Sequence, residues 1–184
     1  MSNRWTLVGI AVIVVAGIWF WTSRRTVDIA SIDLVQAFDA AEKRTDRASL
    51  EEAFSVQEVD IGGTTKRAIY AHPTSRIIWR LEIPDGAWLR TSIGLKPEVW
   101  DQEGDGVLFR IGVSDGRVYE ELLNQLVDPI GNLDDRRWIP VVLDLSGYGG
   151  TEVEVIFNTN TGLPGTPDSR YDWAVWGEPE IYVE

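Results

Sequence analysis

From Phe54 onward, apolar and polar residues alternate with a period of two, and this alternation limits the fold more than any other feature. FSVQEVDI (54–61) is the clearest case, and Gly62-Gly63 joins it to TKRAIYA (65–71), which predicts a β-hairpin. Seven similar segments follow, separated by turns rich in Gly, Asp and Pro: RIIWRLEI (76–83), AWLRTSIGL (87–95), GVLFRIGV (106–113), RVYEELLNQLV (117–127), RWIPVVLDL (137–145), TEVEVIFNT (151–159) and DWAVWGEPEIYV (172–183). The series predicts an all-β sandwich domain over residues 54–184.

Residues 23–53 carry a mixed signal. SIDLVQAFDAAEKR (31–44) places Leu34, Phe38 and Ala41 at helical spacing, and SLEE (49–52) has the Ser-x-x-Glu form of a capping box. The overlapping stretch VDIASIDLV (27–35) alternates as a strand does. We interpret this region as a linker with a strand at 27–35 and one or two short helices up to Phe54, on the N-terminal side of the sandwich.

The run from Trp5 to Thr22 contains no charged residue. Eighteen residues in a helix span about 27 Å, close to the hydrocarbon thickness of a bilayer. Trp5, Trp19 and Trp21 stand at the ends of the run, where tryptophan rings favour the membrane interface. A cleaved signal peptide is the alternative, but the run ends in WFWTSRR instead of a small-residue cleavage site. The sequence therefore predicts one transmembrane anchor at residues 5–22.

Charge bears on the orientation of this anchor and on the partners of the domain. Arg4 precedes the run and Arg24 and Arg25 follow it, so the flanking charges are nearly balanced. A four-residue N-terminal tail is typical of a signal anchor, which favours a single-pass protein with an extracytoplasmic C-terminal domain, periplasmic or at the cell surface. Residues 26–184 contain 14 of the 17 basic residues and all 29 acidic residues, which gives them a net charge of about −15. Such a surface repels phosphate backbones, so nucleic acid is excluded as a partner.

Three stretches together resemble a known family: LKPEVWDQEGDGVLFRIGV (95–113), DDRRWIPVVLDLSGYGGTEVEVIFNT (134–159) and YDWAVWGEPEI (171–181). Their order and spacing are similar to those of galactose-binding-like jelly rolls, β-sandwich modules related to carbohydrate-binding domains of bacterial exported and membrane-anchored proteins. The resemblance covers roughly residues 54–184 and implies a jelly-roll β-sandwich. It does not select a function, because the superfamily includes sugar binders, protein-contact modules and spacers.

Binding modules of this family use loops at one end of the sandwich, where aromatic rings stack on sugars and polar side chains bind hydroxyls. The resemblance therefore implies ligand-binding candidates in the loops: Trp100, Asp101, Arg136, Arg137, Tyr171 and Asp172. The alternative for each aromatic residue is the core, since a buried ring stabilises the fold by several kcal/mol. In DWAVWG, alternation puts Trp173 and Trp176 on opposite faces, so at least one ring is expected in the core.

Metal binding and catalysis receive little support. Asp101, Glu103 and Asp105 alternate in a glycine-containing loop like weak calcium ligands, but acidic turns are common in a protein with this negative charge, and the full EF-hand spacing is absent. The chain has no cysteine, a single histidine (His72) and no G-x-S-x-G frame, so we expect neither an enzyme nor a cofactor.

Two functions remain open from the sequence. The first is a non-catalytic, membrane-anchored interaction module that contacts a protein partner or a membrane complex. The second is a carbohydrate-binding module for cell-surface or cell-wall glycan. Aromatic residues exposed at one loop end would favour the second, and a large apolar patch on a sheet face would favour the first.

Overall fold

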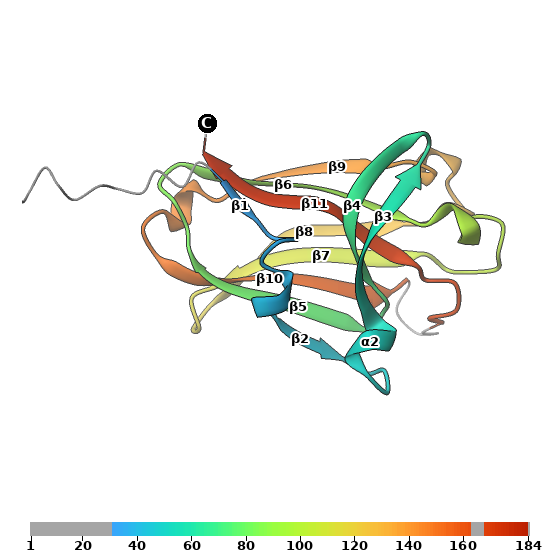
Figure 1. The fold of residues 1–184 in the computed structure, drawn as a ribbon, viewed down its shortest axis with the longest axis horizontal. Coiled ribbons are helices and arrows are strands. Elements are labelled where there is room, and N and C mark those ends of the chain that lie inside the picture. The colour runs from blue at the N-terminus through green and yellow to red at the C-terminus, as the bar shows by residue number, and fades with distance from the viewer. Residues whose placement is uncertain (1–30, 163–167, 184) are drawn as a thin grey trace, which may run out of the picture.

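Two antiparallel sheets packed face to face make up residues 31–162 and 168–183, the part of the chain that the computed structural model describes (Figure 1). The all-β sandwich predicted from the alternation is confirmed. Sheet A has the strand order β3-β4-β11-β6-β9, with β1 also paired to β11: β1 Ser31–Asp33, β3 Phe54–Ile61, β4 Thr64–Ala71, β6 Ala87–Leu95, β9 Ile139–Asp144 and β11 Ala174–Val183. Sheet B has the order β2-β5-β10-β7-β8: β2 Glu42–Thr45, β5 Ser75–Glu82, β7 Val107–Ser114, β8 Tyr119–Val127 and β10 Glu152–Thr161.

Each of the nine alternating segments forms a strand close to its predicted bounds. The hairpin of β3 and β4 is also confirmed, with Phe54 opposite Ala71 and Ile61 opposite Thr64. Its turn residues Gly62 and Gly63 have φ angles of 64° and 81°, the left-handed pair that a two-residue hairpin of type I′ requires. The local pattern was therefore sufficient for the strands and for this turn.

The region before Phe54 differs from its prediction. Part of the predicted strand at 27–35 is present as β1, but the expected helices reduce to α2 (Leu50–Ala53) and a 3-10 turn at Phe38–Ala40. Ser49 caps α2 as the sequence predicted, since its Oγ accepts a bond from the Glu52 backbone N–H. Strand β2 was not predicted. It is four mostly charged residues long, and its conformation is set by pairing with β5 at the edge of sheet B.

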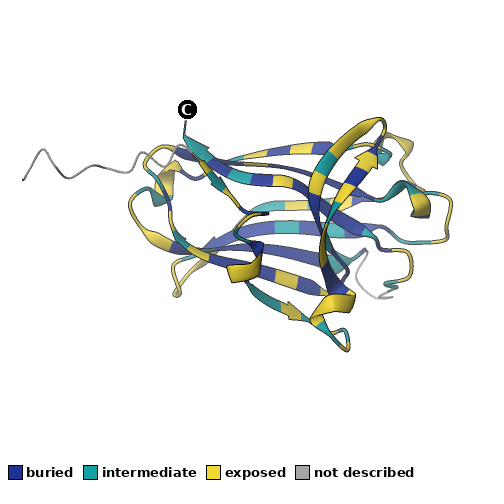
Figure 2. Ribbon diagram, viewed as in Figure 1, coloured by how far each residue is buried: buried dark blue, intermediate teal, exposed yellow. Residues whose placement is uncertain are grey.

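Large aromatic rings fill the space between the sheets. Trp176 is fully buried, and its ring centroid lies 4.8 Å from Phe109 and 4.6 Å from Phe157. Its Nε1 donates to Thr159 Oγ1 at 3.1 Å, which satisfies the one polar atom of the ring. Trp79 completes the cluster against Phe157 at 5.0 Å. Along the strands, buried positions alternate with exposed ones, as Figure 2 shows.

A second, smaller apolar cluster lies on the outer face of sheet A. Val59, Ile61, Ala68 and Val175 are buried there, with Trp100 and Trp138 packed against them. The tip of the β3–β4 hairpin thus covers one part of this face and leaves the rest open.

The predicted anchor, residues 5–22, and its interfacial residues Trp5, Trp19 and Trp21 lie outside the described residues. Within residues 31–162 and 168–183, no helix has the length and apolar character needed to cross a membrane.

Candidate functional site

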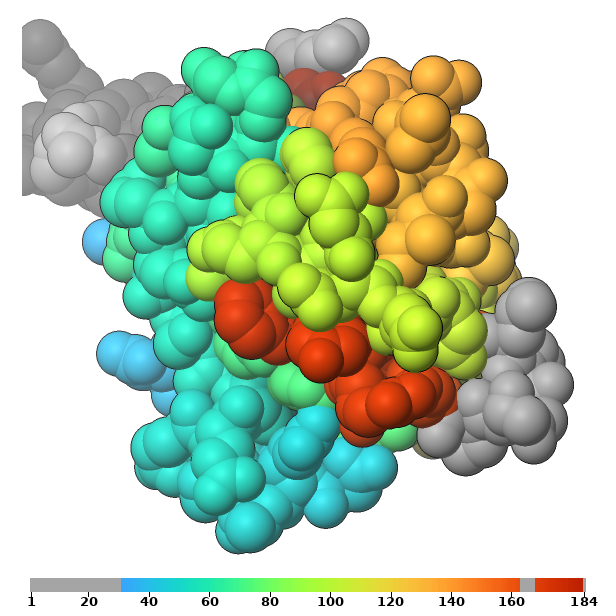
Figure 3. Space-filling view, turned by 90° about the vertical axis from the view of Figure 1, so that its right-hand side faces the viewer, coloured from blue at the N-terminus to red at the C-terminus, as the bar shows by residue number. Residues whose placement is uncertain are grey.

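The loops that carry the predicted ligand-binding residues meet at one end of the sandwich. We call this surface the loop end; it comprises residues 96–106, 128–138 and 168–173. In Figure 3 the yellow-green, orange and red surfaces of these three segments lie side by side. The sequence prediction that the candidates gather at one end therefore agrees with their placement, although their binding role stays a prediction.

Trp100, Asp101 and Arg136 form one cluster at the loop end. The Arg136 guanidinium lies over the Trp100 ring at 5.9 Å from its centroid, and its Nη2 donates to the Trp100 carbonyl at 2.8 Å. The same Nη2 lies 3.1 Å from Asp101 Oδ1, and Trp100 Nε1 donates to the Leu95 carbonyl at 2.9 Å. Trp100 is thus held from both its backbone and its ring nitrogen. These contacts favour a structural role for the ring over a free stacking platform.

Tyr171 and Asp172 lie beside that cluster and line a cavity of about 10 Å³ together with Val99, Asp128 and Pro129. This volume is about that of one water-sized sphere and is far too small for a sugar ring. Tyr171 is exposed, and its φ of 64° is unusual for a residue with a side chain. Arg137 is directed elsewhere, with its Nε donating to the Asp134 carbonyl at 2.9 Å.

Asp172 is a buried acid with few contacts that could offset the cost of burying its charge. Its side chain is 1% exposed, and its Oδ2 has no hydrogen-bond partner within the described residues. Burial, followed by the nearby carboxylates of Asp105 and Asp168, raises the pKa of Asp172 to about 8. The side chain is therefore mostly neutral at pH 7 and unsuited to binding a ligand hydroxyl at the surface.

The weak calcium candidates are not arranged as a chelating set. Asp101 and Glu103 are exposed, and Asp101 is paired with Arg136. Burial raises the pKa of Asp105, which opposes its ionisation. In residues 31–162 and 168–183, no group of three or more His, Cys, Asp or Glu side chains has an arrangement that could hold a metal ion.

His72 is engaged through both ring nitrogens. Its Nδ1 lies 2.7 Å from the Pro73 carbonyl oxygen, and Arg47 Nη2 lies 2.8 Å from both Nδ1 and Nε2. Burial lowers the pKa of His72, so the ring is neutral at physiological pH. Both ring nitrogens lie against protein groups, which favours a structural role for His72.

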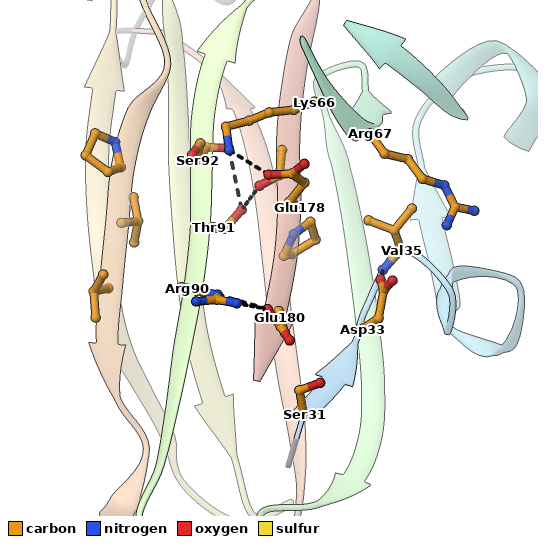
Figure 4. Close-up of a pocket in the computed structure, with 15 residues that line it drawn as sticks. Ser31, Asp33, Val35, Lys66, Arg67, Arg90, Thr91, Ser92, Glu178 and Glu180 are labelled. Carbon is orange, nitrogen blue, oxygen red and sulfur yellow. Dashed lines mark hydrogen bonds and ion pairs between the residues drawn. The ribbon is translucent and has the colours of Figure 1, made fainter. Parts of the chain in front are cut away.

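A depression with a volume of about 670 Å³ lies on the outer face of sheet A. We call it the groove. Its floor is formed by β11, β6 and β9 around Gly177, Ser92 and Pro140, while Lys66 and Arg67 of β4 and residues 31–35 form the sides (Figure 4). Its volume is within the range of about 300–1,000 Å³ that is common for ligand sites.

Two ion pairs occupy the groove. Arg90 and Glu180 are directly opposite each other on β6 and β11, and Arg90 Nη2 and Nε lie 2.6 and 2.9 Å from Glu180 Oε2. Lys66 Nζ lies 2.6 Å from Glu178 Oε2. Figure 4 shows both pairs side by side across the floor. Because the partners are partly exposed, each pair adds little stability but presents donors and acceptors to a ligand.

A bulge in β11 shapes the floor. The pairing of β11 with β6 shifts register between Gly177 and Glu180, and Glu178 has a φ of 47°. Gly177 is needed for packing, since a Cβ there would lie 2.9 Å from Trp138 Cζ3 and 3.0 Å from Lys66 Cδ. Trp138 can lie against the strand for this reason, with its Nε1 donating to the Thr64 carbonyl at 2.9 Å.

The groove was not predicted from the sequence. Its residues come from β1, β4, β6, β9 and β11, whose adjacency depends on sheet order. The one available signal was Gly177-Glu178-Pro179, which interrupts the alternation of the last strand. A break of this kind within a strand indicates a bulge, and bulges are frequent next to binding sites.

Comparison with curated proteins finds a relative of part of the chain. No protein-family model matches the chain. An uncharacterised protein of Archaeoglobus fulgidus is 42% identical over 124 residues, which cover 63% of this chain and 30% of that protein. The chain thus spans about a third of the length of this relative.

Comparison of the structures identifies the fold. A CBM51 domain of Clostridium perfringens GH95, solved with methyl-galactose, has a TM-score of 0.55 at 16% identity and covers 82% of this chain and 99% of that one. TmCBM61, solved with β-1,4-galactotriose, has a TM-score of 0.53 at 14% identity and covers 88% of this chain and 100% of that one. The CBM51-2 and INT domains of Clostridium perfringens ZmpB give 0.51 at 21% identity, covering 77% and 28%. The chain therefore has the β-sandwich fold of carbohydrate-binding modules, in line with the fold that the resemblance implied.

Proposed function

We propose that this domain is a non-catalytic glycan-binding module and that the groove on sheet A is its binding site. The observation that carries the proposal is the groove itself, a depression of about 670 Å³ lined by paired charged side chains. The solved complexes of structural neighbours with methyl-galactose and β-1,4-galactotriose support glycan as the ligand class. The proposal moves the site away from the loop end, where Trp100 is held and the cavity is small.

The chemistry of the groove suits hydroxyl groups. A sugar hydroxyl both donates and accepts, so it is best bound where donors and acceptors lie side by side. Glu178 and Glu180 offer carboxylate oxygens, and Lys66 and Arg90 offer N–H groups within 3 Å of them. Hydrogen bonds to such charged groups contribute about 1.5–3 kcal/mol each.

The test is a comparison of two equivalent ion pairs. Arg90–Glu180 crosses two strands of sheet A inside the groove, and Arg80–Glu154 crosses two strands of sheet B outside it, with directly opposed residues in both cases. The full-length chain, purified in mild detergent, is first screened on a glycan array. Affinity for the glycans bound is then measured by calorimetry. We expect Arg90→Ala/Glu180→Ala to weaken binding about 10- to 100-fold, and Arg80→Ala/Glu154→Ala to leave it unchanged.

Two results would contradict the proposal. One is an array on which no glycan is bound by the folded wild-type chain. The other is glycan binding that survives Arg90→Ala/Glu180→Ala but is lost in Trp100→Ala or Tyr171→Ala, which would return the site to the loop end.

A protein-contact module remains the second candidate, because apolar side chains are exposed along one edge of sheet B. Strand β8 pairs only with β7 among the described strands, and the exposed apolar residues lie on it or next to it: Val118, Tyr119, Leu126, Ile130 and Leu133. An open strand edge of this kind can pair with another chain. Under this alternative, Leu126→Lys would abolish co-purification of a partner from detergent while leaving glycan binding unchanged.

The membrane anchor is a separate proposal, supported by the uncharged run from Trp5 to Thr22. We expect the full-length chain to sediment with membranes and to resist a carbonate wash, and its domain to face the extracytoplasmic side, where glycans are found. Recovery of the full-length chain in the soluble fraction without detergent would contradict this proposal.

A further inference from the structure

The groove runs across the strands of sheet A. Figure 4 shows lining residues on one side from β9, then β6 and β11, and on the other side from β1 and β4. Neighbouring strands lie about 4.8 Å apart, so the path from β4 over β11 and β6 to β9 is about 14 Å long. This length exceeds that of a single pyranose ring.

On the β9 side of the groove, no further strand of sheet A is present among the described residues. Within the described strands β9 is the last of sheet A and pairs only with β6, and Val142 on it is 57% exposed. On the opposite side, β4 pairs with residues 175–177 of β11 and β1 pairs with residues 180–182. The bulge residues Glu178 and Pro179 lie between these two pairings. An extended ligand can therefore continue past the floor in the direction of β9.

The charges in the groove are balanced. Its lining contains three cationic side chains (Lys66, Arg67 and Arg90) and three acidic ones (Asp33, Glu178 and Glu180). Glu178 and Glu180 are paired with Lys66 and Arg90, and Asp33 Oδ1 accepts from two backbone N–H groups at 2.8 and 2.9 Å. A groove of this composition has no net charge to attract an anionic ligand, and the acidic surface around it repels one.

We infer that the groove binds an internal segment of a linear, uncharged glycan chain. The inference rests on the proposed function and adds the class of ligand to it. The length of the groove and its open β9 side favour binding to the middle of an extended chain over binding to a chain end. The balanced ion pairs of the groove favour a ligand with hydroxyl groups over one with carboxylate or sulfate groups.

Chain length provides the first test. Neutral β-1,4-linked galacto-, gluco-, manno- and xylo-oligosaccharides of increasing length are titrated into the full-length chain in detergent. For the series that binds, affinity should rise about tenfold or more from the monosaccharide to the tetrasaccharide and then level off. Reduction of the terminal sugar to its alditol should change the affinity of long oligosaccharides by less than about twofold, because the end lies outside the groove.

Charge provides the second test. Oxidation of the primary hydroxyls of the same chains to carboxylates should weaken binding, and raising the salt concentration should change the affinity for neutral chains by less than about twofold. Strong, salt-sensitive binding of the oxidised chains, or of sulfated chains, would overturn the inference.

Substitutions of two exposed valines provide the third test. Arg90 is directly opposite Val142, so in Val142→Arg the like charges keep the new side chain extended over the β9 side of the groove. This variant should weaken binding of long chains at least about tenfold while changing binding of the monosaccharide little. Val118→Arg, at a valine that is also well exposed but lies outside the groove, should behave as wild type.

The outcomes separate the inference from the proposed function. Equal affinity for monosaccharide and tetrasaccharide, or loss of binding on terminal reduction, would overturn the inference while glycan binding itself stood. Absence of all glycan binding, or binding insensitive to Arg90→Ala/Glu180→Ala, would overturn the proposed function and the inference with it.

Discussion

The loop end and the groove each contain one residue with a side chain in the left-handed backbone region, and the two differ in what that conformation achieves. Tyr171, with a φ of 64°, is exposed beside a cavity of about 10 Å³. Glu178, with a φ of 47°, lies in the bulge of β11 and brings its carboxylate to 2.6 Å from Lys66 Nζ in the groove of about 670 Å³. Such backbone strain is frequent at functional sites, and only in the groove does it accompany space for a ligand.

The tryptophans of the two regions also differ in what they do for the surface beside them. At the loop end, Trp100 is held by Leu95 and Arg136, and this fixed ring supports the loops. Beside the groove, Trp138 lies on Gly177 and so helps to set the shape of the floor. A tryptophan in a loop is therefore a poor guide to a binding site unless the space over its ring is known.

The largest effect that we predict is a loss of stability, and it compares a ring in the core beneath the groove with a ring at the loop end. Trp176→Ala removes a fully buried ring that contacts Phe109 and Phe157, and it should cost about 3–5 kcal/mol of unfolding free energy. Trp100→Ala, at a partly buried ring, should cost roughly half as much. Urea denaturation measures both values. Equal losses would show that the loop end is as much a part of the core as β11.

The next prediction concerns the buried acid of the loop end. The pKa of Asp172 is raised to about 8 in the folded chain, whereas it is about 4 in an unfolded one. The folded state keeps a proton that the unfolded state releases, so this contribution to stability is complete below about pH 4 and is lost as the pH rises to about 8. Asp172→Asn should therefore stabilise the protein by about 2–4 kcal/mol at pH 9 and change it little at pH 4.

Denaturation midpoints of wild type and Asp172→Asn across this pH range test the prediction. Parallel curves for wild type and Asp172→Asn would mean that Asp172 is ionised in the folded chain.

A methyl group added to the groove floor should have a smaller effect on stability and a clear one on binding. In Gly177→Ala the new Cβ meets Trp138 at 2.9 Å, and the adjustment should cost about 1–3 kcal/mol and weaken glycan binding, as calorimetry would show. Gly147→Ala is the control, because nothing lies within 4 Å of the new Cβ there. Unchanged stability and affinity in Gly177→Ala would show that Trp138 does not fix the shape of the groove.

The smallest effect that we predict concerns Tyr171 and Glu178, the two non-glycine residues with positive φ among the described residues. Tyr171→Gly relieves the left-handed conformation and should change stability by at most about 1 kcal/mol in the favourable direction, with glycan affinity unchanged. Glu178→Gly relieves the same strain but removes the partner of Lys66, so it should weaken glycan binding. Thermal denaturation and calorimetry distinguish the two variants, and a loss of binding in Tyr171→Gly alone would assign function to the loop end.

The sequence by itself determined the sandwich and its longer strands, β3 to β11. Side chains alternate between the two faces of a sheet with a period of two. The alternation within segments such as 54–61 and 106–113 therefore predicts both the strand conformation and the face that is buried. The turn at Gly62-Gly63 was likewise local, because the required φ angles belong to glycine. The burial of one ring in DWAVWG followed from the same periodicity.

Only the tertiary structure decided where a ligand could bind. Strand β2 and the groove both depend on which strands become neighbours, and that order is set by long-range packing that no short segment encodes. The sequence brought Trp100, Asp101, Arg136, Tyr171 and Asp172 to one end, but whether space remained between them depended on hydrogen bonds to Leu95, Pro129 and neighbouring backbone. Periodicity reports the face on which a side chain lies, whereas a cavity is the volume that many side chains from distant segments leave unfilled.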